Sequence, residues 1–213
     1  ASLTAPAALA QTLPSTAESS RVQERLRNEE RGLASPELAI PMPGAQKELS
    51  EAEQNRLSKV KFTLNNVVVE DATAIGAADL SATYENLVGK RISLLDAQTI
   101  ARKITALYHN AGYVLTQAVV PQQEVGKGTL RIKVVEGYIS NVVVQGANLS
   151  ERERRVITEH FADIAGKRPA NTRMLERKLL LVNDLAGADA RGVLRPSLNQ
   201  FGAAELVVNV ENK

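Results

Sequence analysis

The stretch AGYVLTQAVVPQQEVGKGTLRIKVVEGYISNVVVQG, residues 111–146, decides the fold. It contains three runs of β-branched and other apolar residues, at 114–120, 130–135 and 139–145. Each run has the length of a strand, and Pro121 and the glycines between the runs favour turns. The stretch therefore predicts three successive strands, of which the first two form a hairpin.

The sequence on either side shows that one pattern is used twice. Gly89-Lys90-Arg91 recurs as Gly166-Lys167-Arg168, at an offset of 77 residues. Apolar residues at helical spacing and alternating residues of the closing strands recur at offsets of 75 to 77. The matched sets are Leu80, Tyr84, Leu87 with Ile157, Phe161, Ile164; Ile100, Ile104, Leu107, Ala111 with Leu175, Leu179, Val182, Ala186; and Leu130, Ile132, Val134 with Leu206, Val208, Val210. Solenoid repeats are shorter, roughly 20–50 residues, so the pattern indicates a duplicated small domain.

We expect an α+β fold in which each unit has the order β-α-α-β-β, over residues 59–136 and 137–213. The strands are predicted at 62–69, 114–120 and 130–135, and then at 139–145, 193–196 and 206–210. Two helices lie between the first and last strands, which should therefore be parallel, whereas the last two strands form an antiparallel hairpin. The helices then cover one face of a three-stranded mixed sheet.

Signals for helix ends occur where these elements require them. A serine followed three residues later by an acidic residue forms a capping box at the start of a helix, and a glycine often ends one. The signals are Ser93 with Asp96, Ser150 with Glu153, Gly112 and Gly187.

The first 58 residues differ in character from the rest. Residues 1–17 are interpreted as a signal remnant or disordered end, because Ala8-Leu9-Ala10 has the form of a signal-peptidase site. Residues 18–31 favour a helix that is polar on nearly all sides, with only Val22 and Leu26 as an apolar pair. Residues 32–58 contain several prolines and are predicted to be a linker, with a short polar helix near 50–59.

Composition argues against catalysis and against nucleic-acid binding. The formal charge is +2, from 26 basic and 24 acidic residues, and a phosphate-backbone binder needs a clustered basic face. Cysteine is absent, and His109 and His160 do not stand in a metal or triad spacing, so we expect both to be surface or capping residues. We therefore expect no enzyme activity, no cofactor and no metal. No apolar run approaches the roughly 20 residues of a membrane-spanning helix.

Residues 111–146 resemble the junction between the two POTRA domains of two-partner-secretion outer-membrane transporters, the TpsB family of haemolysin-activator and haemagglutinin-transporter type. The shared signature is GY at 112–113, a strand ending at Pro121, G-x-L at 128–130 and VVEG-x-I at 134–139. Residues 175–210 resemble the second POTRA domain of that family, so the resemblance covers residues 59–213. Residues 18–31 and 32–58 are similar in character to the plug helix, with its Val22 and Leu26 stripe, and to the linker of the family.

The resemblance implies a periplasmic location and a role in protein transport. The chain would be the periplasmic portion of a longer transporter that recognises an unfolded exoprotein and delivers it to a C-terminal β-barrel pore. The implied partners are this barrel and a TpsA-like exoprotein, of filamentous haemagglutinin or haemolysin type, bound through its N-terminal secretion domain. The alternative is a stand-alone periplasmic POTRA chaperone or envelope scaffold. A KH-type nucleic-acid module is disfavoured, because the loops after Gly89 and Gly166 lack the second glycine of a GXXG clamp.

The strand at 114–120 is the candidate binding site for the exoprotein. A strand at the edge of a small mixed sheet can pair with an extended peptide through its main chain. This strand is uncharged and ends at Pro121, whereas its equivalent at 193–196 is shorter and flanked by Arg191 and Arg195. The predicted partner-binding residues are Val114, Leu115, Thr116, Gln117, Ala118, Val119 and Val120.

Overall fold

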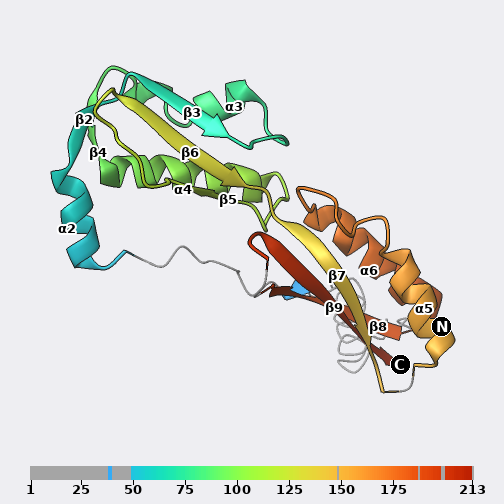
Figure 1. Ribbon diagram of the computed structural model, residues 1–213. Coiled ribbons are helices and arrows are strands. Elements are labelled where there is room, and N and C mark those ends of the chain that lie inside the picture. The colour runs from blue at the N-terminus through green and yellow to red at the C-terminus, as the bar shows by residue number, and fades with distance from the viewer. Residues whose placement is uncertain (1–37, 40–48, 148, 187, 198–199, 213) are drawn as a thin grey trace, which may run out of the picture. The chain divides into compact units, whose positions relative to one another are not determined.

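The structure is a computed structural model that describes residues 38–39, 49–147, 149–186, 188–197 and 200–212 (Figure 1). The helices are α2 (Glu51–Lys59), α3 (Ala77–Ser81), α4 (Leu94–Asn110), α5 (Glu151–His160) and α6 (Thr172–Ala186), with a 3-10 helix η1 (Glu85–Leu87). The strands are β1 (Leu38–Ala39), β2 (Lys61–Thr63), β3 (Asn66–Glu70), β4 (Arg91–Ser93), β5 (Gln117–Val119), β6 (Thr129–Val135), β7 (Tyr138–Gln145), β8 (Ala188–Pro196) and β9 (Ala203–Asn212). The predictions for residues 1–17 and 18–31, including Val22 and Leu26, lie outside the described residues.

The first unit has the predicted mixed sheet. Its strand order is β3-β6-β5, with β3 parallel to β6 and β5 antiparallel to it. Helix α4 runs along this sheet (Figure 1), and the face of the helix that includes Ile100 and Ile104 is buried. It packs in one hydrophobic cluster with alternate residues of β6, among them Leu130 and Ile132. Burial of these alternate residues explains why the period of two in the sequence marked the core side of the strand.

The second unit repeats this arrangement with a separate hydrophobic cluster. Strand β7 is parallel to β9, and β8 pairs with β9 as an antiparallel hairpin. Buried residues of α6, Leu175 and Leu179, pack with Leu206 and Val208 of β9. The parallel first and last strands and the closing hairpin are thus confirmed in both units, as is the α+β fold.

The residues predicted to begin and end helices do so wherever they fall within the described part of the chain. Capping boxes are formed at Ser93 and Ser150, and the same arrangement at Ser50 begins α2. Gly112 follows the end of α4 with a positive φ of 93°, where a side chain would be strained. Gly187 lies outside the described residues.

The repeated glycines are equivalent in conformation as well as in sequence. Gly89 and Gly166 have φ of 80° and 78°, in the left-handed region that favours glycine. Each donates its N–H to the carbonyl of the strand segment that opens its unit, Gly89 to Leu64 at 2.7 Å and Gly166 to Ile139 at 2.8 Å. The two units therefore share a local hydrogen bond that the repeat of Gly-Lys-Arg marks.

Three predicted elements of the first unit are shorter or broken in the structure. The strand at 62–69 is divided into β2 and β3, because the main chain exchanges its pairing partner: Leu64 N–H donates to Lys90, but Asn65 N–H donates to Gly128. The helix expected across Leu80, Tyr84 and Leu87 is replaced by the short helices α3 and η1. The hydroxyls of Ser81 and Thr83 donate to carbonyls three residues back, and the main chain there forms i→i−3 turns instead of a continuous α-helix.

The strand predicted at 114–120 is also shorter, because only Gln117–Val119 pair as β5. The preceding residues form turns, in which Tyr113 N–H donates to Tyr108 and Thr116 N–H donates to Tyr113. The histidines differ from expectation as well. Both are half-buried: His109 contacts the carbonyl of Thr116, and the ring of His160 packs edge-on against Phe161 at 5.6 Å.

The Pro-containing segment 32–58 contains more regular structure than predicted. In addition to the expected polar helix, now α2, residues 38–39 form β1, which pairs in parallel with β8 (Figure 1). The second sheet is therefore four-stranded, in the order β1-β8-β9-β7. Sequence patterning could not predict β1, because two residues carry no periodicity and the strand exists only where β8 offers hydrogen-bonding groups.

Each hydrophobic cluster supplies a stability prediction. Ile104 and Leu179 are fully buried in the first and second clusters, so Ile104→Ala and Leu179→Ala should each lower the free energy of unfolding by roughly 2–5 kcal/mol in urea titrations. Leu181→Ala on the exposed side of α6 is the control and should change it by less than about 0.5 kcal/mol. A loss below about 1 kcal/mol for either buried residue would show that the corresponding cluster does not stabilise the fold.

Candidate functional site at the junction of the two units

Glu136 lies at the point where β6 of the first sheet leads into β7 of the second. Its carboxylate accepts hydrogen bonds from the N–H groups of Thr73 and Ala74 at 2.7 and 3.0 Å, and from the Thr73 hydroxyl at 2.6 Å. The hydroxyl of Tyr108, a fully buried residue of α4, donates a further bond of 3.0 Å. One side chain thus joins the loop after β3, the helix α4 and the end of β6.

The hydrogen bonds around Glu136 set its protonation. Burial, the largest single influence, favours the neutral acid and raises its pKa, but the bonds from Thr73, Ala74 and Tyr108 together outweigh burial, so the pKa of Glu136 is lowered. Burial, followed by the hydrogen bond to the Glu136 carboxylate, raises the pKa of Tyr108. Glu136 is therefore a charged acceptor and Tyr108 a neutral donor at neutral pH.

Close backbone approach fixes the connection between the units. A Cβ at Gly137 would overlap the carbonyl oxygen of Leu115, so this position tolerates only glycine without movement. The carbonyl of Gly112 accepts two bonds of 2.9 Å from Thr172, one from its N–H and one from its hydroxyl. The end of α4 is thereby attached to the beginning of α6.

Tyr138, the first residue of β7, is held on both sides. Its N–H donates to the carbonyl of Gly202 at 2.9 Å, and its hydroxyl donates to the side chain of Gln200 at 2.8 Å. The guanidinium of Arg168 lies over the ring, 3.7 Å from its centroid, which is cation–π geometry. The second copy of the Gly-Lys-Arg motif thus contacts the junction.

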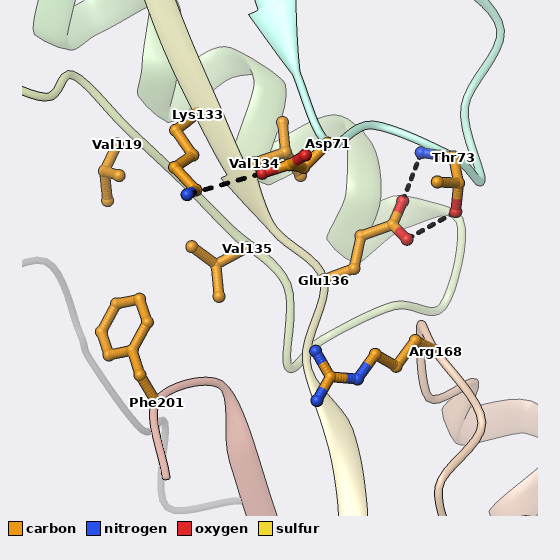
Figure 2. A pocket seen from close by; sticks show the side chains of 9 residues that line it. All are labelled: Asp71, Thr73, Val119, Lys133, Val134, Val135, Glu136, Arg168 and Phe201. Carbon is orange, nitrogen blue, oxygen red and sulfur yellow. Dashed lines mark hydrogen bonds and ion pairs between the residues drawn. The ribbon is translucent and has the colours of Figure 1, made fainter.

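A groove of about 630 Å³ lies beside Glu136 (Figure 2). Its lining combines the apolar side chains of Val119 and Val135 with the cationic side chains of Lys133 and Arg168, and Phe201 from the β8–β9 turn. An adjoining hollow of about 210 Å³ shares Val135 and Phe201 and is also lined by Leu115 and Gln117. We call these two hollows together the junction groove.

Phe201 is the most unusual residue of the junction groove. Its side chain is 79% exposed, although the chain has only three phenylalanines. The ring therefore offers a large apolar area that a contact could bury. The charges near it are mixed, because Lys133 lies 3.6 Å from Asp71 in an exposed ion pair that contributes little to stability.

The predicted binding strand lies at the edge of the first sheet, but its outward-facing main chain is already hydrogen-bonded. The N–H of Ala118 donates to the hydroxyl of Thr105 at 2.9 Å, and the carbonyl of Thr116 accepts from Nε2 of His109 at 3.0 Å. Of Thr116 and Gln117, Gln117 pairs with β6, whereas the N–H of Thr116 donates to the carbonyl of Tyr113 in the preceding turn. Side chains of α4 therefore cover the edge that a peptide would have to pair with.

The structure gathers some predicted site residues and adds others. Leu115, Gln117 and Val119 of the predicted strand line the junction groove. The sequence analysis missed Glu136, Arg168 and Phe201 as site residues; Glu136 lies within the VVEG signature, and Phe201 is a lone aromatic in a polar turn. In the described part of the chain, no group of three His, Asp or Glu side chains could hold a metal ion.

The comparison with protein families decides what this fold is. Residues 62–137 match the family described as POTRA domain, ShlB-type. The chain carries a ShlB-type POTRA domain. This match confirms the resemblance found in the VVEG signature, and it ends at Gly137, the glycine that approaches Leu115.

Two curated relatives are transporters by name. The heme/hemopexin transporter protein HuxB of Haemophilus influenzae strain 86-028NP is 25% identical over 162 residues, which cover 72% of this chain and 27% of the relative. The outer membrane transporter CdiB of Escherichia coli is 26% identical over 124 residues, which cover 58% of this chain and 20% of the relative. The chain thus spans 27% of the length of HuxB and 20% of the length of CdiB.

Solved structures confirm the POTRA fold. CdiB from Escherichia coli matches with a TM-score of 0.63 at 21% identity, over 96% of this chain and 37% of that chain. POTRA1-3 of the periplasmic domain of Omp85 from Anabaena match with a TM-score of 0.58 at 21% identity, over 71% of this chain and 66% of that chain. The matching part of Omp85 is by its name a periplasmic domain. Within the described ranges, no helix is long and apolar enough to cross a membrane.

The charge of Glu136 should make the stability of the POTRA fold depend on acid pH. Glu136→Gln should cost about 1.5–3 kcal/mol at pH 7, because its hydrogen bonds are made to a charged acceptor. A lowered pKa contributes stability above the ordinary value of 4.5, and this contribution is lost as the pH falls through the folded-state pKa. Urea titrations at several pH values should therefore show the parent and Glu136→Gln converging below pH 4.5.

The control for this titration is Glu124→Gln at an exposed position, which should change stability by less than about 0.5 kcal/mol. A gap between parent and Glu136→Gln that stays constant from neutral to acid pH would mean that the Glu136 carboxylate is not the group responsible.

Gly137→Ala tests the close approach at the junction. The added Cβ must displace the Leu115 backbone, so the substitution should cost about 1–3 kcal/mol and lower the melting temperature. Gly126→Ala is the matched control, because no atom lies within 4 Å of its Cβ position, and it should be neutral or slightly stabilising. Equal melting temperatures for the two variants would contradict the junction geometry.

Proposed function

We propose that the chain is the periplasmic part of a two-partner-secretion transporter, where it recognises an unfolded exoprotein and delivers it to a C-terminal β-barrel pore. The ShlB-type POTRA match at residues 62–137 carries this proposal. The curated relatives named as transporters, HuxB and CdiB, support it. The partner is an exoprotein of the TpsA type, of filamentous haemagglutinin or haemolysin kind, held through its N-terminal secretion domain.

The junction groove suits an extended polypeptide. Phe201, Val119 and Val135 offer apolar surface on which a partner side chain can be buried, and Lys133 and Arg168 add cationic groups beside it. Aromatic and arginine side chains are the residue types that most often dominate binding energy at interfaces. An unfolded chain exposes apolar side chains at short intervals, so it can fill such a groove without first adopting a fold.

Residues 114–120 contribute to this recognition through side chains in the junction groove. Main-chain pairing at Ala118 and Thr116 would have to break the hydrogen bonds from Thr105 and His109. Leu115, Gln117 and Val119, by contrast, already line the groove. Binding through side chains therefore costs less than binding through the edge of β5.

The alternative function is that of a stand-alone periplasmic POTRA chaperone or scaffold. Both functions use the same groove, so the discriminating observation is genetic: whether the reading frame continues beyond Lys213 into barrel strands beside a gene for a large exported protein. The POTRA relatives named as outer-membrane or heme transporters favour the transporter.

Substitution of Phe201 tests the proposed function. Immobilised chain should capture the labelled N-terminal secretion domain of the neighbouring exoprotein, and Phe201→Ala should weaken this capture by roughly tenfold, as expected for a central aromatic contact. Val156→Ala, at a 56% exposed position on α5 outside the groove, is the control and should bind as the parent does. Unchanged capture by Phe201→Ala would exclude the junction groove, and absence of capture by the parent would contradict the proposed function.

A further inference from the structure

The duplication allows the outer faces of two equivalent helices to be compared. Helices α4 and α6 correspond, because Ile104 and Leu179 are fully buried at matching positions 75 residues apart. Within α4, which is described throughout, every large apolar side chain is buried or half-buried. Helix α6 differs, since three of its large apolar side chains are 44–47% exposed: Met174, Leu180 and Leu181.

The fold does not require these exposed apolar residues. Helix α4 carries small or polar residues at the equivalent positions and still packs on its sheet. The matched pairs are Thr99 with Met174, Thr105 with Leu180, and Ala106 with Leu181. The preceding helices show the same difference, because Val156 on α5 is 56% exposed and corresponds to Asp79 on α3. The exposed apolar side chains are therefore a property of the second unit alone.

Helices α5 and α6 belong to one surface of the second unit. Both pack in the same hydrophobic cluster and lie on the same side of the second sheet (Figure 1). Lys178 of α6 joins them, because its Nζ donates to the carbonyl of His160, the last residue of α5, at 2.6 Å. The same Nζ lies 2.6 Å from a carboxylate oxygen of Asp163.

The exposed charges of this surface are mainly cationic. Three of its acidic side chains already have partners: Glu153 binds the cap residue Ser150, and Glu151 and Asp163 form ion pairs within the unit. Arg168 lies over the ring of Tyr138. The exposed charged residues that remain between 151 and 186 are five cations and three acids, namely Arg152, Arg155, Lys167, Arg173 and Arg177 against Glu159, Glu176 and Asp184. We call these residues, together with Val156, Met174, Leu180 and Leu181, the outer helix face.

We propose that the outer helix face binds a membrane surface that contains anionic phospholipid. Guanidinium groups bind phosphate oxygens through two parallel hydrogen bonds, and Arg173 and Arg177 stand one helical turn apart on the exposed side of α6. Aliphatic side chains beside such cations can be buried at the level of the lipid headgroups. The inference rests on the proposed function, because a transporter in the outer membrane holds its periplasmic part near phospholipid.

The outer helix face is built from different elements than the junction groove. The groove is lined by residues of β5 and β6 and by Phe201 of the β8–β9 turn, whereas the outer helix face belongs to α5, α6 and the segment between them. We therefore expect membrane binding and capture of the exoprotein to be separable by substitution.

Sedimentation with sucrose-loaded vesicles measures membrane binding by the full chain. The chain should bind vesicles of phosphatidylethanolamine with about one-third phosphatidylglycerol roughly tenfold more tightly than vesicles in which phosphatidylcholine replaces phosphatidylglycerol. Arg173→Gln with Arg177→Gln should weaken this binding roughly tenfold, as should Leu180→Ser with Leu181→Ser. Added salt should weaken the binding of the parent, because it screens exposed charges.

Two double substitutions outside the outer helix face are the matched controls. Lys90→Gln with Lys103→Gln removes the same charge from exposed positions of the first unit. Val60→Ser with Val88→Ser removes apolar side chains that are 46% and 44% exposed, as Leu180 and Leu181 nearly are. Both controls should bind the anionic vesicles as the parent does.

A fluorescent label reads the contact directly and does not depend on the stability of the double variants. The natural sequence contains no cysteine, so Leu181→Cys can carry a single environment-sensitive nitrobenzoxadiazole group. Its emission should become stronger and shift to the blue on anionic vesicles. Ala106→Cys, at the equivalent exposed position of α4, is the matched control and should show no change.

Absence of vesicle binding by the parent would overturn the inference, as would equal emission changes at positions 181 and 106. A parent chain that ignores vesicles but self-associates in sedimentation velocity, and loses this association with Leu180→Ser and Leu181→Ser, would show that the outer helix face is instead an interface between two copies.

Capture of the exoprotein secretion domain in solution separates this inference from the proposed function. Leu180→Ser with Leu181→Ser should capture the domain as the parent does. If vesicle binding fails and capture persists, the inference is wrong and the proposed function stands. If the parent captures no domain but still inserts the label at position 181 into anionic vesicles, the proposed function fails and the outer helix face remains a membrane-binding surface.

Discussion

The carboxylate of Glu136 is the interaction on which the junction of this protein depends. It accepts bonds from the loop after β3 and from Tyr108 of α4, at the place where β6 passes into β7. A half-buried carboxylate loses part of its hydration, and here donors from two segments, the loop after β3 and helix α4, replace it. The hydrogen bonds of Glu136 hold these segments together. They therefore also fix the positions of the residues that line the groove beside it.

Unpaired sheet edges are the second constraint. A three-stranded sheet has two exposed edges, each a row of main-chain groups that attracts other strands. In the first unit, Thr105 and His109 from α4 satisfy the outward groups of β5, a strand of only three residues. In the second unit, β8 is too long for one helix side chain to cover, and residues 38–39 pair with it. The two units thus satisfy their outer strand edges in different ways, one with helix side chains and the other with a short additional strand.

The proposed function requires surfaces that are apolar or open but do not cause aggregation. The exposed ring of Phe201 lies among cationic side chains, and the flank of β8 carries Arg191 and Arg195. Charged residues beside an open edge or an exposed aromatic discourage self-association while leaving the surface available to an extended polypeptide.

The sequence by itself determined the duplication, the strand directions and the helix caps, because these depend on periodicity and on residues close in the chain, such as Ser93 with Asp96. It also determined the family, since the VVEG signature is contiguous. Only the tertiary structure decided that Phe62–Val69 is two strands and that Thr105 and His109 cover β5. It also decided that residues 38–39 pair with β8 and that Phe201 joins Val119 in one groove. Each of these features depends on contacts between residues distant in sequence, and local pattern carries no information about where such residues meet.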